Sequence, residues 1–370
     1  MGATMATATA QRIRTINGSG FFNCITLRYY YGGMLNEPIE LDGLVIRNRM
    51  WLPPMCQYQA EDGIPNDWHL VHYGARAAGG FGLLIIESTA VTPDGRISPN
   101  DVGLWNDEQA AAWQPITAFI HKMGAKCAVQ LAHAGRKAGV YPAVQSEKKG
   151  PIPGWDRVSP GTEPFANFPA PRALTTEEIA EIPALFAAAA VRAVTAGFDA
   201  VEIHAAHGYL LHSFVSPLTN TREDRYGERS LLLREVCTAV KAAVDVPVLV
   251  RVSASDFCEG GLQIEDTVEL AKQLRDCGVS LIDVSGGGLT PFKSWDAIEG
   301  EFPGFASRIG KVLPVASVGG ILNPAQGERM LREGIDAALI GRAALWDASW
   351  PMRAGVTPPP SYAQGVRDQR

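Results

Sequence analysis

The chain has 370 residues, 46% of them hydrophobic, and a formal net charge of −6. This length suits two ordinary domains or one large α/β barrel, which commonly runs to roughly 250 residues or more. The acidic balance argues against a nucleic-acid partner, because such proteins carry a basic stripe. The sequence holds no apolar run of about 18 residues that would cross a bilayer, so we expect no membrane partner either.

The N-terminal residues differ in composition from the rest of the chain. Residues 1–36 contain no Asp or Glu but include three arginines. This is typical of an organelle-targeting segment, although a disordered leader or a misassigned start codon explains it better. We therefore predict an extension over residues 1–36, a barrel domain over residues 37–351 and a Pro-rich tail over residues 352–370.

The cysteines indicate a reducing compartment. They lie at positions 24, 56, 127, 237, 258 and 277 and form no Cys-x-x-Cys pair. Spacing of this kind favours free thiols over a disulfide framework or a clustered metal site. We expect a cytoplasmic protein, with an organelle as the alternative location.

Short β-rich runs alternate with helical patterns along the chain. The runs are residues 50–55, 82–88, 126–132, 200–206, 246–254, 281–286, 314–319 and 337–341. Most are continuously apolar, as strands buried on both faces should be. Helical patterns between them cover residues 107–123, 175–196, 230–244, 265–277 and 324–333. Eight such units predict an α/β fold consisting of a single (β/α)8 TIM barrel.

Helix caps support these boundaries. Thr175 and Glu178 have the spacing of a capping box, and Asn323 precedes Pro324 as an N-cap followed by proline in the first turn.

Polar residues follow most of the predicted strands. In a barrel of this type, the C-terminal strand ends form the active face. Gly319 and Gly320 follow the seventh strand, and Gly341 and Arg342 follow the eighth. Backbone N–H groups at glycines together with a guanidinium are suited to a phosphate. The alternative is that these glycines serve only turns and that Arg342 caps a helix or pairs with Asp347.

The segment 201–209, Val-Glu-Ile-His-Ala-Ala-His-Gly-Tyr, ends the fourth strand with three polar rings. The imidazoles of His204 and His207 can hold an oxygen that gains negative charge, and the phenol of Tyr209 can deliver a proton. This combination indicates reduction of a polarised double bond. The alternative is hydrogen-bonded core residues. We predict no metal here, because zinc usually takes a thiolate or carboxylate as well and no Cys lies in the segment.

Several motifs together resemble the old yellow enzyme family of FMN-dependent ene-reductases, in particular the bacterial-type branch that includes the xenobiotic reductases and NADPH dehydrogenases. They are Arg47-Asn48-Arg49, Pro54-Met55-Cys56-Gln57-Tyr58, Gln130-Leu131-Ala132-His133-Ala134-Gly135-Arg136-Lys137-Ala138, the 204–209 segment, Arg251-Val252-Ser253-Ala254 and Gly341-Arg342. The resemblance runs from about residue 36 to about residue 351 and implies one barrel with FMN at its top.

The resemblance also implies a role for each candidate residue. The residues implied to bind the cofactor are Pro53, Pro54, Met55, Cys56, Ser88, Gln130, Arg251, Gly319, Gly320, Gly341 and Arg342. Substrate would be bound by Tyr58, His204 and His207, with Tyr209 as the proton donor. Structural alternatives exist for three of them: Cys56 as a small buried residue, Gln130 as a backbone cap, and Arg251 as a partner of Asp256 or Asp283.

The implied activity is a ping-pong reaction. NADPH, or NADH, gives hydride to FMN, and the hydride then passes to the β-carbon of an alkene activated by a carbonyl or nitro group. The rival interpretations are a flavin-binding protein with little turnover and a flavin-free barrel enzyme acting on a phosphorylated substrate. An iron–sulfur flavoprotein is a further rival, although the clustered cysteines that it requires are missing.

Two departures from the family pattern concern loops. About four residues are missing after Gly227, and Gln364 stands where some relatives place an arginine that reaches a neighbouring subunit, with Arg367 as a potential substitute. The expected assembly is therefore a monomer or a homo-oligomer.

Overall fold

A computed structural model describes residues 33–144, 146–291 and 298–369. Most of the predicted extension lies outside these residues, as does the side chain of Arg367, so the domain limits at residues 36 and 351 stay predictions. Within the described part of the chain, no helix is both long enough and apolar enough to span a membrane.

Eight parallel strands form a closed barrel in which consecutive strands pair and the last pairs with the first. The strands are β3 (Met50–Leu52), β4 (Leu83–Ala90), β5 (Lys126–Ala132), β8 (Ala200–Ala205), β9 (Val248–Ser253), β10 (Leu281–Ser285), β11 (Val315–Ser317) and β12 (Ala337–Leu339). Each overlaps one of the eight predicted runs, so the (β/α)8 prediction is confirmed. The runs are apolar throughout because one set of side chains fills the barrel and the other packs against the helices.

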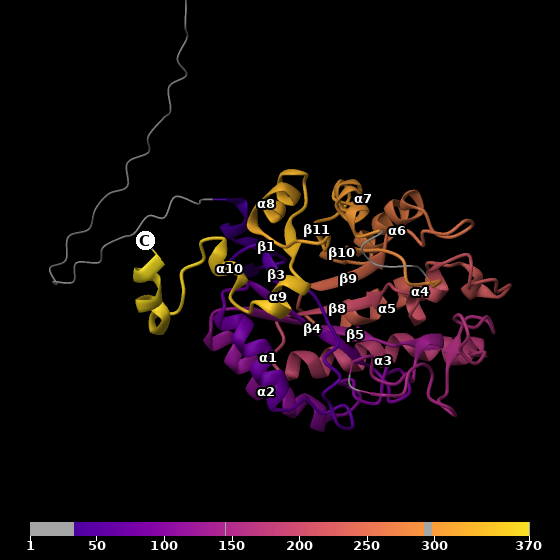
Figure 1. Ribbon diagram of the computed structural model, residues 1–370. Coiled ribbons are helices and arrows are strands. Elements are labelled where there is room, and N and C mark those ends of the chain that lie inside the picture. The colour runs from indigo at the N-terminus through magenta and orange to yellow at the C-terminus, as the bar shows by residue number, and fades with distance from the viewer. Residues whose placement is uncertain (1–32, 145, 292–297, 370) are drawn as a thin grey trace, which may run out of the picture. The chain divides into compact units, whose positions relative to one another are not determined.

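Helices surround the strands (Figure 1). The main ones are α1 (Asp67–Ala78), α2 (Asp107–Lys122), α3 (Thr176–Thr195), α5 (Leu231–Ala243), α6 (Ile264–Asp276), α7 (Phe302–Ile309) and α8 (Pro324–Arg332). The five predicted helices agree with α2, α3, α5, α6 and α8 to within one residue at each end. Both predicted caps are present, since Thr175 Oγ1 accepts a hydrogen bond from the Glu178 N–H and Asn323 Oδ1 accepts one from Gln326.

Shorter elements complete the chain. They are η1 (Met34–Asn36), η2 (Gly135–Lys137), α4 (Leu210–Val215), η3 (Arg225–Gly227), η5 (Glu299–Glu301), α9 (Arg342–Trp346), α10 (Trp350–Arg353), η6 (Pro360–Gln369) and the parallel pair β6 (Val158–Ser159) and β7 (Arg172–Ala173). The loop before α5 is fastened by Arg222, which donates hydrogen bonds to the carbonyls of Pro160 and Leu174.

A β-hairpin closes the N-terminal end of the barrel. Its strands, β1 (Ile39–Leu41) and β2 (Leu44–Ile46), are joined by Asp42 and Gly43, both with positive φ. An Asp-Gly pair favours this turn because its backbone twist matches that of the strands. The hairpin's buried side chains join one apolar cluster with the inward residues of the strands: Leu41, Ile46, Trp51, Leu83, Ile85, Ala128, Ala200, Leu249, Leu281, Ala316, Ala337 and Leu339. The site must therefore lie at the other end.

Candidate active site

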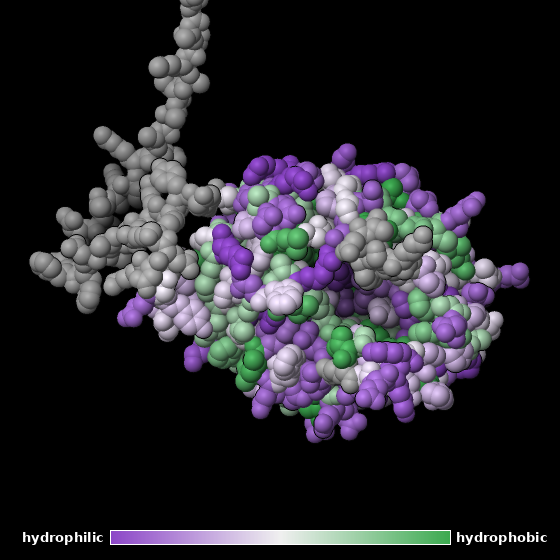
Figure 2. Space-filling view, in the orientation of Figure 1, coloured by the Kyte–Doolittle hydropathy of each residue, from purple (hydrophilic) through white to green (hydrophobic). Residues whose placement is uncertain are grey.

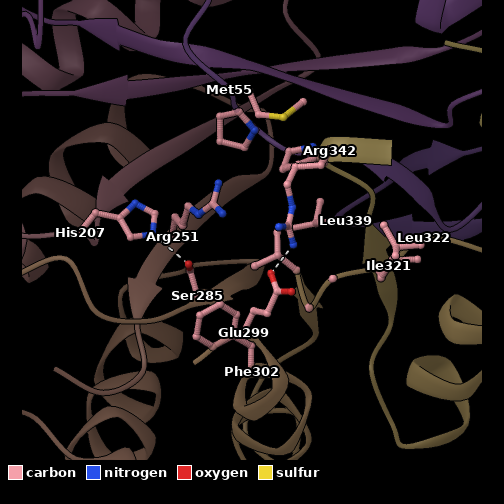
Figure 3. A pocket seen from close by; sticks show the side chains of 16 residues that line it. Met55, His207, Arg251, Ser285, Glu299, Phe302, Ile321, Leu322, Leu339 and Arg342 are labelled. Carbon is pink, nitrogen blue, oxygen red and sulfur yellow. Dashed lines mark hydrogen bonds and ion pairs between the residues drawn. The ribbon is translucent and has the colours of Figure 1, made fainter. Parts of the chain in front are cut away.

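A cavity of about 280 Å³ opens at the C-terminal end of the barrel. It is lined by Pro53, Pro54, Met55, His207, Arg251, Ser285, Glu299, Phe302, Val318, Gly319, Gly320, Ile321, Leu322, Leu339, Gly341 and Arg342. The surface is hollowed on this face (Figure 2), and Figure 3 shows His207 and Arg251 on one side of the cavity and Arg342 with Glu299 on the other. Nine of the predicted site residues thus meet in one cavity, from the loops after β3, β8, β11 and β12 and from β9.

A carboxylate of the chain itself lies at the predicted phosphate position. The Glu299 carboxylate, from η5, forms an ion pair with the Arg342 guanidinium. A Cβ atom added at Gly320, which has a φ of +64°, would lie 2.7 Å from Glu299 Oε1. The glycine backbone therefore lets an anionic oxygen approach closely, and the arginine balances its charge. Arg342 does not use Asp347, which pairs with Arg353.

Polar side chains form a layer inside the barrel, two residues beyond the apolar cluster. Gln130, Glu202, Arg251 and Asp283 lie on four consecutive strands, and all four are buried. Gln130 Nε2 donates a hydrogen bond to Glu202 Oε1 at 2.7 Å, and Arg251 Nε lies 3.4 Å from Asp283 Oδ2. Of the structural alternatives, the pairing of Arg251 with Asp283 is therefore present, whereas Gln130 bonds to a side chain and not to backbone.

The three rings of the 204–209 segment lie together. The His204 ring centroid is 5.2 Å from that of His207 and 5.0 Å from that of Tyr209, edge to face in both pairs. Burial, followed by the charge of Arg251, holds the pKa of both imidazoles well below its usual range. Both rings are therefore neutral near pH 7. Because His204 Nδ1 accepts a hydrogen bond from the Ala206 N–H, its proton lies on Nε2 and is available to a ligand.

Backbone contacts hold His207 in an unusual conformation. His207 has a φ of +59°, and its N–H donates to Ser253 Oγ at 2.9 Å. Lys137 Nζ donates to the carbonyls of His207 and Gly288, so this lysine anchors the turn. The imidazole Nε2 lies 2.8 Å from Ser285 Oγ. The turn is thus fixed from η2 and from the ends of β9 and β10, as a preorganised hydrogen-bonding group requires.

The neighbourhood of Tyr209 includes two more predicted residues. Tyr209 and Cys56 pack on the same small apolar cluster. Burial raises the pKa of the Tyr209 phenol well above its usual range. Burial likewise raises the pKa of the Cys56 thiol, to which the Ser88 backbone gives a hydrogen bond. The phenol and the thiol are therefore protonated at neutral pH.

A buried carboxyl fastens the loop that carries Cys56 and Tyr58. Glu87, on β4, accepts hydrogen bonds from the Gln57 N–H at 2.6 Å and from the Tyr73 hydroxyl at 3.1 Å. Burial raises the pKa of Glu87 to about 8. The pairing of β4 with β5 shifts register at this point, between Ile86 and Thr89, as at a β-bulge, which bends a strand locally.

These features fit a phosphorylated, planar, redox-active cofactor. The cavity has an anion position at one end, and buried Arg251 lines its wall, where its Nε forms an ion pair with Asp283 but no hydrogen bond to any described residue. The chain matches the NADH:flavin oxidoreductase / NADH oxidase family over residues 34–357. The chain belongs to this family, the old yellow enzyme family. It is an oxidoreductase whose family cofactor is FMN, reduced by a nicotinamide dinucleotide, which confirms the predicted enzyme class and cofactors.

Individual relatives agree with this assignment. The chain is 45% identical over 320 residues to an NADPH dehydrogenase of Listeria monocytogenes, covering 83% of this chain and 89% of that protein. It is 39% identical over 327 residues to an NADPH dehydrogenase of Halalkalibacterium halodurans, covering 85% and 91% respectively. Among solved structures, morphinone reductase in complex with tetrahydroNAD is similar with a TM-score of 0.72 and 27% identity, covering 88% of this chain and 93% of that one. Family membership favours FMN over the flavin-free alternative.

Some residues at the site were not predicted. Ser285 and Glu299 line the cavity, and Glu87 and Glu202 hold predicted residues in place. Asp283 does so too, although the sequence suggested it only as a structural partner of Arg251. The sequence does contain a signal for Glu202 and Asp283: each is an acid within an apolar strand, and a buried acid needs a hydrogen-bond or ion-pair partner. One cluster of three potential metal ligands is found among the described residues, His121, Cys127 and Asp199, where β5 and β8 begin at the opposite end of the barrel. Its Asp199 already pairs with Lys126.

Proposed function

We propose that this protein is an ene-reductase that uses NADPH to reduce alkenes conjugated to a carbonyl or nitro group. The observation that carries the proposal is the grouping of two neutral imidazoles and one protonated phenol beside a cavity with Arg251 in its wall. When bound, FMN supplies the hydride chemistry that links the nicotinamide to the β-carbon of the alkene.

His204 and His207 bind the oxygen of the substrate's carbonyl or nitro group. Their ring N–H groups strengthen their hydrogen bonds as negative charge grows on that oxygen, so they stabilise the transition state more than the bound substrate. By analogy with oxyanion holes, each donor contributes about 3–4 kcal/mol. The hydroxyl of Ser285, 2.8 Å from His207 Nε2, can either donate or accept a hydrogen bond, so it suits both tautomers of this imidazole.

Tyr209 protonates the α-carbon. Its phenol holds its proton at neutral pH because the ring is buried. Lys137 Nζ lies 5.1 Å from the centre of this ring, and burial, followed by the charge of Arg136, lowers the pKa of this lysine to about 7. When it is protonated, its charge stabilises the phenolate that remains after proton transfer. Tyr58 would contact the substrate from the loop after β3.

The remaining predicted residues would hold FMN. Pro53, Pro54, Met55, Cys56 and Ser88 would line the ring, and Gln130 and Arg251 would meet its polar edge from the layer beneath. Gly319, Gly320, Gly341 and Arg342 would hold the phosphate, where a carboxylate now lies. The donor set is appropriate, since glycine N–H groups and a guanidinium both favour phosphate oxygens.

For the setting of the protein, we propose the cytoplasm and a monomer or homo-oligomer. The cysteines without paired spacing and the bacterial origin of the relatives support this location.

An anaerobic absorbance experiment tests the function. The purified protein should be yellow, lose its colour with NADPH and regain it when cyclohexenone is added. Loss of colour that the enone does not reverse would support the flavin-binding alternative with little turnover. A colourless protein that takes up no FMN would contradict the proposal.

A further inference from the structure

Two acids lie inside the barrel, and among the described residues Arg251 is the positive charge placed to balance them. Glu202 and Asp283 have side chains that are 0% exposed, and Arg251 is the cation between their strands. Leu249, Leu281, Ala200 and Ala128 close the space below them. A buried charge without a partner costs several kcal/mol, so two carboxylates beside one guanidinium would leave the layer with an uncompensated charge.

The carboxyl oxygens in this layer outnumber the hydrogen-bond donors that reach them. Glu202 Oε1 accepts from Gln130, but Glu202 Oε2 and both Asp283 oxygens have no hydrogen-bond donor among the described residues. The two carboxyl groups are near enough to hydrogen-bond to each other, which two ionised carboxylates cannot do. A single proton on Glu202 Oε2, donated to Asp283, would provide a donor for the acid pair.

The surroundings decide which acid holds this proton. Arg251 lies against Asp283 and stabilises its negative charge. Burial raises the pKa of Asp283 to about 6, with Arg251 opposing the rise. Burial and the neighbouring Asp283 raise the pKa of Glu202 much further. At neutral pH Asp283 is therefore ionised and Glu202 is neutral.

We propose that Glu202 retains a proton that it donates to Asp283, and that this pair positions Gln130 and Arg251 for the polar edge of FMN. Neutral Glu202 accepts the Gln130 amide N–H, so the amide oxygen of Gln130 is left for a ring N–H of the cofactor. Ionised Asp283 aligns Arg251 and keeps the layer's net charge at zero. This inference rests on the proposed FMN site, and it makes Glu202 and Asp283 positioning residues.

Substitutions at Glu202 separate a neutral acid from a charged one. In Glu202→Gln, the new amide has the shape of a neutral acid: its oxygen can accept from Gln130 and its N–H can donate to Asp283. We expect the FMN dissociation constant and the midpoint potential of the bound flavin to stay near those of the unsubstituted protein. Glu202→Leu removes both hydrogen bonds, so we expect about tenfold weaker FMN binding and a shifted potential.

Infrared spectroscopy detects the proton directly. A protonated carboxyl absorbs apart from ionised carboxylates, so the difference spectrum between the unsubstituted protein and Glu202→Gln at neutral pH should contain one protonated carboxyl band that shifts in D2O. The same comparison works on protein stripped of FMN. It needs only the Gln variant, so it decides the question even if Glu202→Leu does not fold.

Either of two results would overturn the inference: no protonated carboxyl band lost in Glu202→Gln, or a Gln variant whose FMN affinity and potential change as much as those of the Leu variant. Failure of the proposed function would look different. A protein that binds FMN but is not reoxidised by an enone would leave all of these comparisons unchanged.

Discussion

At the N-terminal end of the barrel, the inward side chains are apolar and the β1–β2 hairpin covers them. Two residues further along the same strands, the inward positions hold Gln130, Glu202, Arg251 and Asp283, and several of their atoms form no hydrogen bond to a described residue. The two layers are successive inward positions of the same strands, because side chains at i and i+2 point to the same face. The comparison teaches that one set of strands provides stability at one end and chemistry at the other. Substitutions should therefore affect stability at one end and activity or binding at the other.

The largest effect on stability should come from the apolar end. Trp51 is fully buried in the apolar cluster, and its Nε1 donates to the carbonyl of Asn48. We expect Trp51→Ala to lower the free energy of unfolding by about 3–5 kcal/mol, because it leaves a cavity and an unpaired carbonyl. Chemical denaturation followed by circular dichroism measures this. Trp346→Ala is the matched control, since Trp346 is 93% exposed and its loss should cost less than about 0.5 kcal/mol. Equal costs would contradict the comparison.

Tyr209→Phe should affect activity strongly and stability little, the reverse of Trp51→Ala. The variant keeps the ring and loses only the hydroxyl, so stability should change by less than about 1 kcal/mol. Alkene reduction should slow by about 100-fold or more, whereas reduction of the flavin by NADPH should stay nearly unchanged. Stopped-flow measurement of the two half-reactions provides an internal control. Equal slowing of both would show that Tyr209 is not the proton donor.

The phosphate end allows paired substitutions with opposite signs. Arg342→Ala should raise the FMN dissociation constant about ten- to hundredfold, because a charge-assisted hydrogen bond is lost. Glu299→Gln should tighten FMN binding a few-fold, since the carboxylate competes with phosphate for Arg342. Titration of FMN-free protein with FMN, followed by flavin fluorescence, measures both. Arg353→Ala, whose ion pair with Asp347 lies outside the cavity, should leave binding unchanged. Weaker binding in Glu299→Gln would argue against competition.

The Glu299 pair shows where sequence reasoning ends. The barrel could be predicted because apolar runs and caps are local signals, and the group of His204, His207 and Tyr209 could be predicted because all three lie within six residues of sequence. Glu299 reaches Arg342 across 43 residues, from a segment without strand or helix periodicity. Such a contact depends on how separate loops approach each other, which residue spacing does not encode.

Acids within strands were partly predictable, unlike the contact between Glu299 and Arg342. Glu202 and Asp283 interrupt apolar runs, so their burial could be inferred from the sequence. Asp283 was one of two suggested partners of Arg251, but strand register in the closed barrel decides between the two and also gives Glu202 its partner. The same holds for Glu87, whose partner Gln57 belongs to the loop after a different strand. Helix α1, which carries Tyr73, was not among the predicted helices. Sequence reasoning therefore found the residues proposed to touch ligands more readily than those that hold them.

The last expected effect is spread over several pH units and concerns the pH dependence of stability through Glu87. Its pKa is about 8 in the folded protein and about 4.3 in an unfolded chain. Between these values the folded state binds a proton that the unfolded state has released, so stability falls as pH rises. The slope for one group is less than about 1.4 kcal/mol per pH unit. Glu87→Gln should flatten this slope in denaturation series between pH 5 and 8, because the amide does not titrate.

The matched control for Glu87 is Glu40→Gln, since Glu40 is an exposed carboxyl on the hairpin at the opposite end of the barrel. Its slope should match that of the unsubstituted protein. An unchanged slope in Glu87→Gln would mean that Glu87 is ionised in the fold. The Gln57 N–H would then donate to a carboxylate, and the loop with Cys56 and Tyr58 would be held by a charge-assisted hydrogen bond instead of a neutral one. The measurement therefore determines which charge the active end of the barrel keeps beneath that loop.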